Sequence, residues 1–207
     1  MAICCCWFQL QSAQALASEA AAGPDKTILV VGDSLSAEYG LRRGSGWVSI
    51  LAEKLAAGKT GYQIQNASIS GDTTSGGLSR LPAALAHHQP HIVIVELGSN
   101  DALRGLPLEM TQRNLSKMTE LAQQAGADVL LVGMQIPPNY GPSYAGQFKE
   151  LFKVLADRHH TRLVPFLLEG MAADREKFQS DGIHPNEDAQ PILADNVWKH
   201  LEPMLGP

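Results

Sequence analysis

The sequence has almost no cysteine. Its three cysteines, Cys4, Cys5 and Cys6, lie together at the N-terminal end, and the rest of the 207 residues contain none. Adjacent cysteines cannot easily bridge one another, because a disulfide needs its two backbones at a particular separation. The composition therefore excludes a disulfide-based fold, and it excludes thiol chemistry in the chain beyond Cys6.

Long hydrophobic runs are also absent. The apolar segment Ala2–Leu10 is too short to span a bilayer, and no later segment approaches the roughly 20 residues required. Small residues follow at Ala13–Ala17, which is typical of a signal-peptide core with its cleavage site. We expect a signal peptide over residues 1–24, a periplasmic or secreted protein, and no stable membrane anchor. A disordered tail is the alternative, because no Lys or Arg precedes the apolar segment.

The third missing feature is an excess of positive charge. The chain has 16 basic and 21 acidic side chains, giving a net charge of -5, and both signs are interspersed along the sequence. A nucleic-acid-binding protein would cluster Lys and Arg on one surface. We therefore expect no nucleic acid as a partner, and we expect a monomer.

Residues 25–207 are long enough for one domain, and in them apolar β-rich runs alternate with segments of helical periodicity. The predicted strands are Thr27–Val31, Tyr62–Ala67, His91–Leu97, Val129–Met134 and Thr161–Val164. The predicted helices are Trp47–Ala57, Leu78–His88, Leu108–Ala125, Tyr144–Leu155 and Asp188–Leu201. This α/β alternation predicts a three-layer α/β/α sandwich around a mostly parallel, five-stranded sheet. In such folds ligands bind beyond the carboxyl ends of the strands.

The first of these carboxyl-end loops contains a candidate nucleophile, Ser34, in the segment Gly32–Ser36. A serine directly after a strand can expose its hydroxyl group and present backbone N–H groups to an anion. Taken alone, such a serine is more often a turn former or a helix N-cap.

The loop before the last predicted helix contains a candidate base, His184, with Asp181 three positions earlier. A serine hydroxyl needs a base to take its proton, and a carboxylate bonded to Nδ1 orients such a histidine. The alternative is an aspartate that stabilises a turn beside a surface histidine.

Two further loops contain candidate oxyanion donors. Gly71 lets the backbone approach closely and can present its N–H, and Asn100 can present its side-chain amide. The N–H of Ser34 would be a third donor. Separately, glycine and asparagine are ordinary loop residues.

In this order, these segments resemble the sequence blocks of the SGNH (GDSL) hydrolases, closest to the bacterial thioesterase/lysophospholipase/arylesterase branch, over Ile28 to Trp198. The resemblance implies a flavodoxin-like sheet, no metal and no cofactor. It also implies the triad Ser34, Asp181 and His184, with Ser34, Gly71 and Asn100 forming the oxyanion hole. One departure is Ser99, where the family usually has a glycine. If that position needs a positive φ, Ser99 should carry a small strain.

Substrate contacts are expected from two segments beside these loops. Ser75, Gly76, Gly77 and Leu78 suit a mobile loop that closes over an acyl chain, and a simple helix-entry turn is the alternative. Pro138 and Tyr140 are expected to form another wall of the groove. His87, His88 and His91 are close in sequence, but neither a cysteine nor paired carboxylates accompany them, so we predict no metal site.

The sequence thus predicts a serine esterase that acts on small acyl esters or thioesters, such as aryl esters, acyl-CoA or lysophospholipids, through an acyl-enzyme. Two alternatives remain at this point. One is a carbohydrate acetylesterase with the same triad. The other is a non-catalytic lipid-binding protein.

Overall fold

A single parallel sheet forms the centre of the molecule. The computed structural model describes residues 26–58 and 60–206, and in it five strands pair in the order β2-β1-β3-β4-β5, every pairing parallel. The strands are β1 (Lys26–Gly32), β2 (Tyr62–Asn66), β3 (Ile92–Glu96), β4 (Asp128–Val132) and β5 (Arg162–Val164). The predicted α/β fold is confirmed, with a sheet that is fully rather than mostly parallel.

The two central strands are continuous apolar runs because helices cover both of their faces. All residues of β3 are buried, as are those of β1 from Ile28 onward. The edge strands are shorter or more polar: β2 contains two glutamines and β5 has only three residues.

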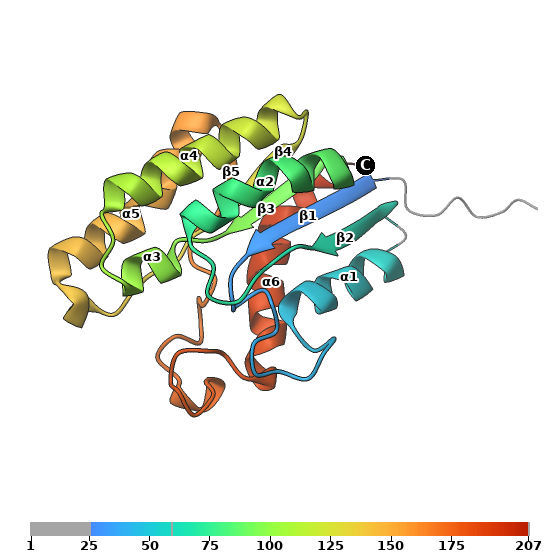
Figure 1. Ribbon diagram of the computed structural model, residues 1–207. Helices are drawn as coiled ribbons and strands as arrows, with labels where there is room; N and C mark the ends of the chain where they lie inside the picture. The colour runs from blue at the N-terminus through green and yellow to red at the C-terminus, as the bar shows by residue number, and fades with distance from the viewer. Residues whose placement is uncertain (1–25, 59, 207) are drawn as a thin grey trace, which may run out of the picture.

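Two layers of helices enclose this sheet (Figure 1). α1 and α6 pack together on one side, and α2, α4 and α5 pack side by side on the other. The helices are α1 (Trp47–Ala57), α2 (Thr74–His88), α3 (Ser99–Leu103), α4 (Leu108–Gln124), α5 (Pro142–His159) and α6 (Gln190–Leu201). The predicted three-layer sandwich is therefore confirmed.

Helix boundaries differ from the prediction where a local end signal decides them. α2 begins at Thr74, before the predicted Leu78, because the Thr73 side chain caps it by accepting a hydrogen bond from the Gly76 N–H at 3.3 Å. α5 begins at Pro142, whose ring suits the first turn of a helix, and ends at His159, because the next residue, His160, has a left-handed conformation. The short helix α3 was not predicted, because five residues are too few to show helical periodicity.

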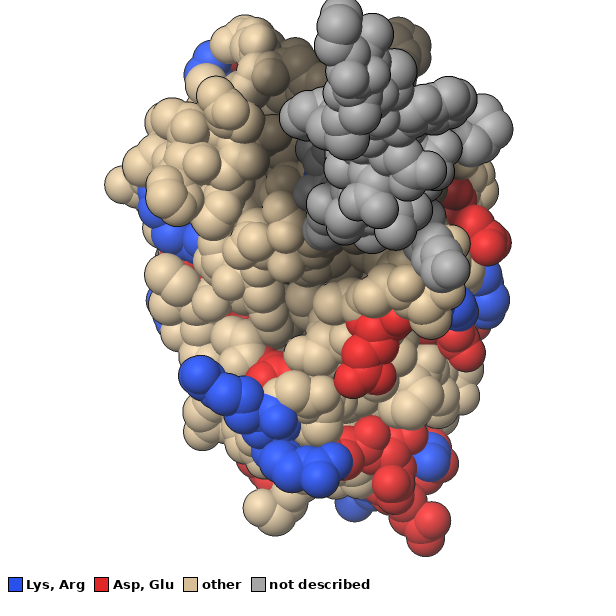
Figure 2. Space-filling view, turned by 90° about the vertical axis from the view of Figure 1, so that its right-hand side faces the viewer, with Lys and Arg blue, Asp and Glu red and all other residues tan. Residues whose placement is uncertain are grey.

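The predicted signal peptide over residues 1–24 lies outside the described residues. None of the helices in residues 26–58 and 60–206 is both long and apolar enough to cross a membrane. On the face shown in Figure 2, Lys and Arg side chains lie among Asp and Glu, and no large basic patch covers it.

The strand order also determines where a site can form. The chain moves from β1 outward to β2 and then crosses back past β1 to β3, so a topological switch point lies between β1 and β3. Because these three strands are parallel, the loops that follow them lie at the same edge of the sheet. These loops contain Ser34, Gly71 and Asn100 respectively.

Candidate active site

Ser34 lies in a series of turns that follows the buried end of β1. Hydrogen bonds from the N–H groups of Ser36 and Ala37 to the carbonyl oxygen of Asp33 stabilise the first turn, at 3.3 and 3.0 Å. The neighbours Asp33 and Leu35 are buried, whereas Ser34 is partly exposed. The backbone therefore presents this hydroxyl group at the surface while it anchors the residues on either side.

His184 and Asp181 lie on one short loop that is closed at its base. An antiparallel bridge joins Phe178 to Pro185, and the N–H of Gln179 donates to the carbonyl oxygen of His184 at 2.8 Å. Gly182 has a φ of 70°, a left-handed conformation that glycine adopts without strain. This tight turn folds the Asp181 carboxylate back onto the histidine.

The three side chains form a continuous chain of polar contacts. His184 Nε2 lies 3.0 Å from Ser34 Oγ, and His184 Nδ1 lies 2.7 Å from Asp181 Oδ2. Burial opposes ionisation of Asp181, but hydrogen bonds from the N–H groups of His184 and Ile183 and from the His184 ring lower its pKa to about 2. At neutral pH, Asp181 is therefore ionised and can accept a hydrogen bond from a proton on Nδ1 of His184.

Two backbone N–H groups beside Ser34 are open. Gly71 has a φ of 78°, which suits glycine, and its carbonyl oxygen accepts a hydrogen bond from Arg104 at 2.9 Å. Within the described residues, neither the N–H of Gly71 nor that of Ser34 donates a hydrogen bond. Both are available to a negatively charged oxygen.

The amide of Asn100 is oriented by two acceptors. Its Nδ2 donates to Asp33 Oδ2 and to the carbonyl oxygen of Asp72, both at 3.0 Å. Asp101, the next residue, is fully buried and accepts hydrogen bonds from the N–H and hydroxyl group of Thr74. These contacts join α3 to the start of α2 and fix the position of the amide nitrogen.

Comparisons with known proteins identify the family of this chain. The model of the GDSL-like lipase/acylhydrolase family matches residues 30–190. The chain belongs to this family. It is an ester hydrolase, a class that its relatives share by name.

Three relatives show how far the likeness extends. Esterase TesA of Pseudomonas aeruginosa is 50% identical over 87% of this chain and 90% of its own length. Thioesterase 1/protease 1/lysophospholipase L1 of Escherichia coli K12 is 43% identical over 86% of this chain and 85% of its own. A crystal structure of the psychrotrophic esterase EstA from Pseudoalteromonas sp., inhibited by monoethylphosphonate, superposes with a TM-score of 0.83 at 40% identity, covering 87% of this chain and 99% of that one.

The expected strain at Ser99 of this GDSL hydrolase is absent. The positive φ in the third sequence block, 120°, belongs to Gly98, and Ser99 begins α3 with ordinary helical geometry. The condition for strain, a positive φ at Ser99, is not met, because the residue with the positive φ is the one before it. Ser99 is buried, and its hydroxyl group has no partner within the described residues.

The predicted closing loop is part of a helix in this GDSL hydrolase. Ser75, Gly76, Gly77 and Leu78 all lie in the first turns of α2, so the mobile-loop interpretation was wrong and the helix-entry alternative holds. The glycines serve packing. A Cβ at Gly77 would lie 2.3 Å from the side chain of buried Leu97, and one at Gly76 would lie 1.9 Å from Asp72 Oδ1.

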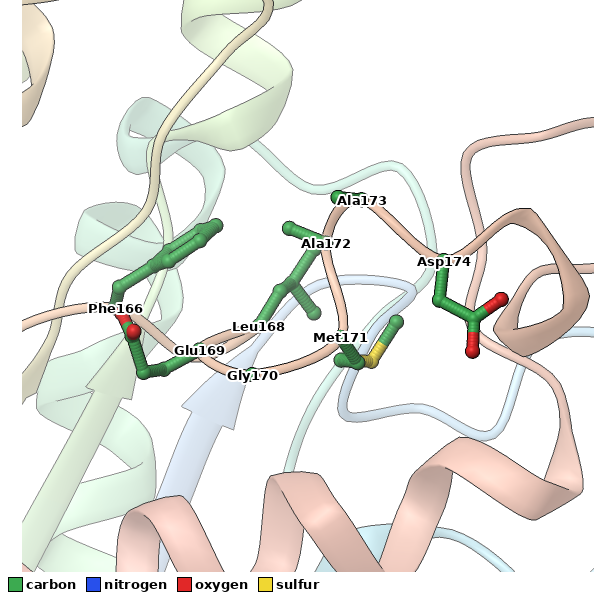
Figure 3. A pocket seen from close by; sticks show the side chains of 8 residues that line it. All are labelled: Phe166, Leu168, Glu169, Gly170, Met171, Ala172, Ala173 and Asp174. Atoms are coloured by element: carbon green, nitrogen blue, oxygen red, sulfur yellow. The ribbon is translucent and has the colours of Figure 1, made fainter.

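Pro138 and Tyr140 lie in a 3₁₀ turn after β4, and the Tyr140 ring is exposed. A pocket of about 550 Å³ lies elsewhere, on the segment between β5 and the His184 loop. Figure 3 shows this one segment bending around it. The pocket contains none of the predicted catalytic residues, so the triad lies outside it. Its lining residues are Phe166, Leu168, Glu169, Gly170, Met171, Ala172, Ala173 and Asp174.

Tyr39 is a site residue that sequence reasoning missed. Its ring packs on the imidazole of His184, with centroids 4.5 Å apart and planes tilted by 39°. Its carbonyl oxygen accepts a hydrogen bond from Gln179 Nε2 at 2.8 Å, which ties the Ser34 loop to the His184 loop. No periodicity or spacing in the sequence indicates this contact. Among the described residues, no three His, Cys, Asp or Glu side chains form a group that could hold a metal ion.

Proposed function

We propose that this GDSL hydrolase cleaves acyl esters and thioesters through an acyl-enzyme on Ser34. The observation that carries the proposal is the 3.0 Å contact between Ser34 Oγ and His184 Nε2, with Asp181 on the other ring nitrogen. A neutral imidazole in this position takes the hydroxyl proton as Oγ attacks the substrate carbonyl carbon. The resulting imidazolium then gives that proton to the leaving alcohol or thiol.

The second half of the reaction repeats these steps with water. Water attacks the acyl carbon while His184 takes one of its protons, and the acid leaves as Ser34 Oγ regains a proton from the histidine. Asp181 remains ionised throughout and stabilises the imidazolium that forms twice in each turnover.

The N–H groups of Ser34 and Gly71 and the amide of Asn100 are proposed to bind the oxyanion of each tetrahedral intermediate. Both hydrogens of the Asn100 amide already have acceptors, at Asp33 and at the Asp72 carbonyl oxygen. The oxyanion therefore competes with the neutral carbonyl oxygen for one of them. The bond to Asp33 keeps the amide nitrogen facing the reaction centre.

The substrate class is proposed from the side chains around the triad. Three of the exposed large apolar residues, Tyr39, Ile69 and Ile183, come from the same loops as Ser34, Gly71 and His184. An acyl chain extending from the ester carbonyl would contact such side chains. The relatives named as thioesterase and lysophospholipase point in the same direction. Tyr140 and Leu78 are also proposed to contact the acyl chain of the substrate. Residues 1–24 are separately proposed to be an export signal.

Hydrolysis of p-nitrophenyl esters from acetyl to palmitoyl, of palmitoyl-CoA and of a lysophospholipid tests this proposal. We expect turnover of esters of several chain lengths and of the thioester. Acetylated xylan is the comparison substrate. If acetylated xylan is hydrolysed faster than every acyl ester and thioester, the acetylesterase alternative replaces the proposed substrate class.

Replacing Asn100 with alanine is expected to lower kcat for p-nitrophenyl butyrate by about 10²–10³-fold, with little change in KM. One donor to the oxyanion is removed, whereas the ground-state ester hardly uses it. Asn196→Ala is the matched control, because the Asn196 amide also donates to two acceptors, the carbonyl oxygens of Leu167 and Glu169, and contacts neither the Ser34 loop nor α3. An unchanged kcat in Asn100→Ala would exclude Asn100 from the oxyanion hole.

Acidification is expected to lower activity, with a fall in kcat/KM centred near pH 6. Burial raises the pKa of Asp33 to about 6, so Asp33 takes up a proton in this range, whereas Asp181, with a pKa of about 2, does not. Protonation weakens Asp33 as the acceptor of the Asn100 amide hydrogen, because a carboxylate is a stronger acceptor than a neutral acid. A kcat/KM that is unchanged across this pH range would contradict this role of Asp33.

A further inference from the structure

Two carboxyl groups lie buried together behind Ser34. Gly32 at the end of β1 pairs with Glu96 at the end of β3, so Asp33 and Glu96 are neighbours across the sheet. Asp33 is 1% exposed and Glu96 is 0% exposed. A buried carboxylate is costly unless it is paired, and neither residue forms an ion pair within the described part of the chain.

The hydrogen bonds of Glu96 leave one oxygen without a partner. Glu96 Oε2 accepts from the Ser36 hydroxyl group at 2.7 Å and from the Asp33 N–H at 3.2 Å. Glu96 Oε1 is buried and accepts no hydrogen bond from any described residue. A buried oxygen of this kind is rare in folded proteins, and a proton on it would remove the difficulty by turning it into a donor.

Asp33 is the acceptor that such a donor requires. Its Oδ1 accepts from the Leu35 N–H and its Oδ2 from the Asn100 amide, both at 3.0 Å, and its own N–H donates to Glu96 Oε2, so the two carboxyl groups lie side by side. Two carboxyl groups can share a hydrogen bond only when one of them is protonated. Burial raises the pKa of Asp33 to about 6, and burial together with the neighbouring Asp33 holds the pKa of Glu96 well above its usual range.

We propose that Glu96 retains a proton on Oε1 at neutral pH and donates it to Asp33, and that this bond holds Asp33 as the acceptor that orients the Asn100 amide. Both carboxyl groups are positioning residues: they act through Asn100 and do not touch the substrate. The proposal rests on the proposed function, because the orientation of Asn100 affects the reaction only if Asn100 binds the oxyanion.

The charged groups around the pair support one negative charge and not two. Arg80 of α2 directs its guanidinium to backbone carbonyl oxygens, that of Gly32 included, and to the carboxylate of Asp72. Asp101 of α3 accepts hydrogen bonds from Thr74, and the ring nitrogens of His184 contact Asp181 and Ser34. No cation therefore contacts either carboxyl group among the described residues. With one negative charge, on Asp33, the carboxylate accepts hydrogen bonds from the Leu35 N–H, the Asn100 amide and the proton of Glu96. In this state Asp33 has all its donors.

The variant Glu96→Gln keeps the size and shape of the side chain but replaces the acid proton with an amide group. Its amide can donate to Asp33 permanently, so kcat is expected within about threefold of wild type. Glu96→Leu provides no donor, and the resulting loss of Asn100 alignment should lower kcat about tenfold or more at unchanged KM. Asp195→Asn, an exposed carboxyl group paired only with Lys54, is the control and should match wild type.

Infrared spectroscopy tests the proton itself. The difference spectrum of wild type minus Glu96→Gln at pH 7 should contain the C=O stretching band of a protonated carboxylic acid, whether or not Glu96→Leu folds. Absence of this band would overturn the proposal. A wild-type kcat in folded Glu96→Leu would overturn the positioning role. If the band is present but Asn100→Ala retains full activity, the proton assignment stands and the proposed oxyanion hole fails.

Discussion

Replacing Ser34 with alanine is expected to lower kcat/KM for p-nitrophenyl esters by about 10⁵–10⁶-fold. The attacking oxygen is removed, and His184 loses the group whose proton it takes at 3.0 Å. The remaining activity should come from water oriented by the oxyanion donors, with no burst of p-nitrophenol. Steady-state and pre-steady-state release of p-nitrophenol measure both effects.

Ser45→Ala is the matched control for this variant. Ser45 lies in the same connection between β1 and α1, and its hydroxyl group donates only to the carbonyl oxygen of Arg42, at 2.6 Å. We expect wild-type kinetics from it. If Ser34→Ala retains activity within tenfold of wild type while its circular dichroism spectrum is unchanged, a different residue is the nucleophile.

Replacing Asp181 with asparagine is expected to lower kcat by about 10⁴-fold at neutral pH. The asparagine side-chain oxygen can still accept hydrogen bonds from the N–H groups of Ile183 and His184, so the turn should keep its shape. Its NH₂ group then faces His184 Nδ1, which is 2.7 Å away in the wild type. The ring must place its proton on Nε2, and it can no longer accept the proton of Ser34.

Asp174→Asn provides the control on the neighbouring turn. Asp174 accepts a hydrogen bond from the Glu176 N–H at 3.0 Å, a local turn contact comparable to that of Asp181, and it does not contact His184. Its kcat should equal that of wild type. Nitrogen-15 NMR of the imidazole would report the tautomer directly, and an unchanged tautomer in Asp181→Asn would contradict this explanation.

The sheet could be predicted from the sequence because its strands are distinct apolar runs. The run His91–Leu97 contains β3, and Gly32 and Gly98 mark where β1 and β3 stop. The same strand ends indicated where Ser34 and Asn100 would lie. Chain order and the parallel sheet are enough to place three loops at one edge, without any knowledge of side-chain contacts.

Contacts between side chains that are distant in sequence could not be predicted. Glu96 lies in an apolar strand and a buried carboxyl group needs a partner, but the identity of that partner depends on the pairing of β1 with β3. The stacking of Tyr39 on His184 depends on how two irregular loops meet. The glycines at Gly76 and Gly77 suggested mobility from composition alone, whereas their role is to let α2 approach Asp72 and Leu97.

The most direct test of the account is covalent labelling with a p-nitrophenyl phosphonate, a reagent class suggested by the phosphonate-inhibited EstA structure. A phosphonate that reacts with an activated serine leaves a stable analogue of the tetrahedral intermediate. Peptide mapping by mass spectrometry should find one adduct per chain, on Ser34, formed in parallel with the loss of esterase activity and absent from Ser34→Ala. An adduct on a different residue that accompanies the loss of activity, or complete inhibition with Ser34 unmodified, would contradict the proposal that Ser34 is the nucleophile.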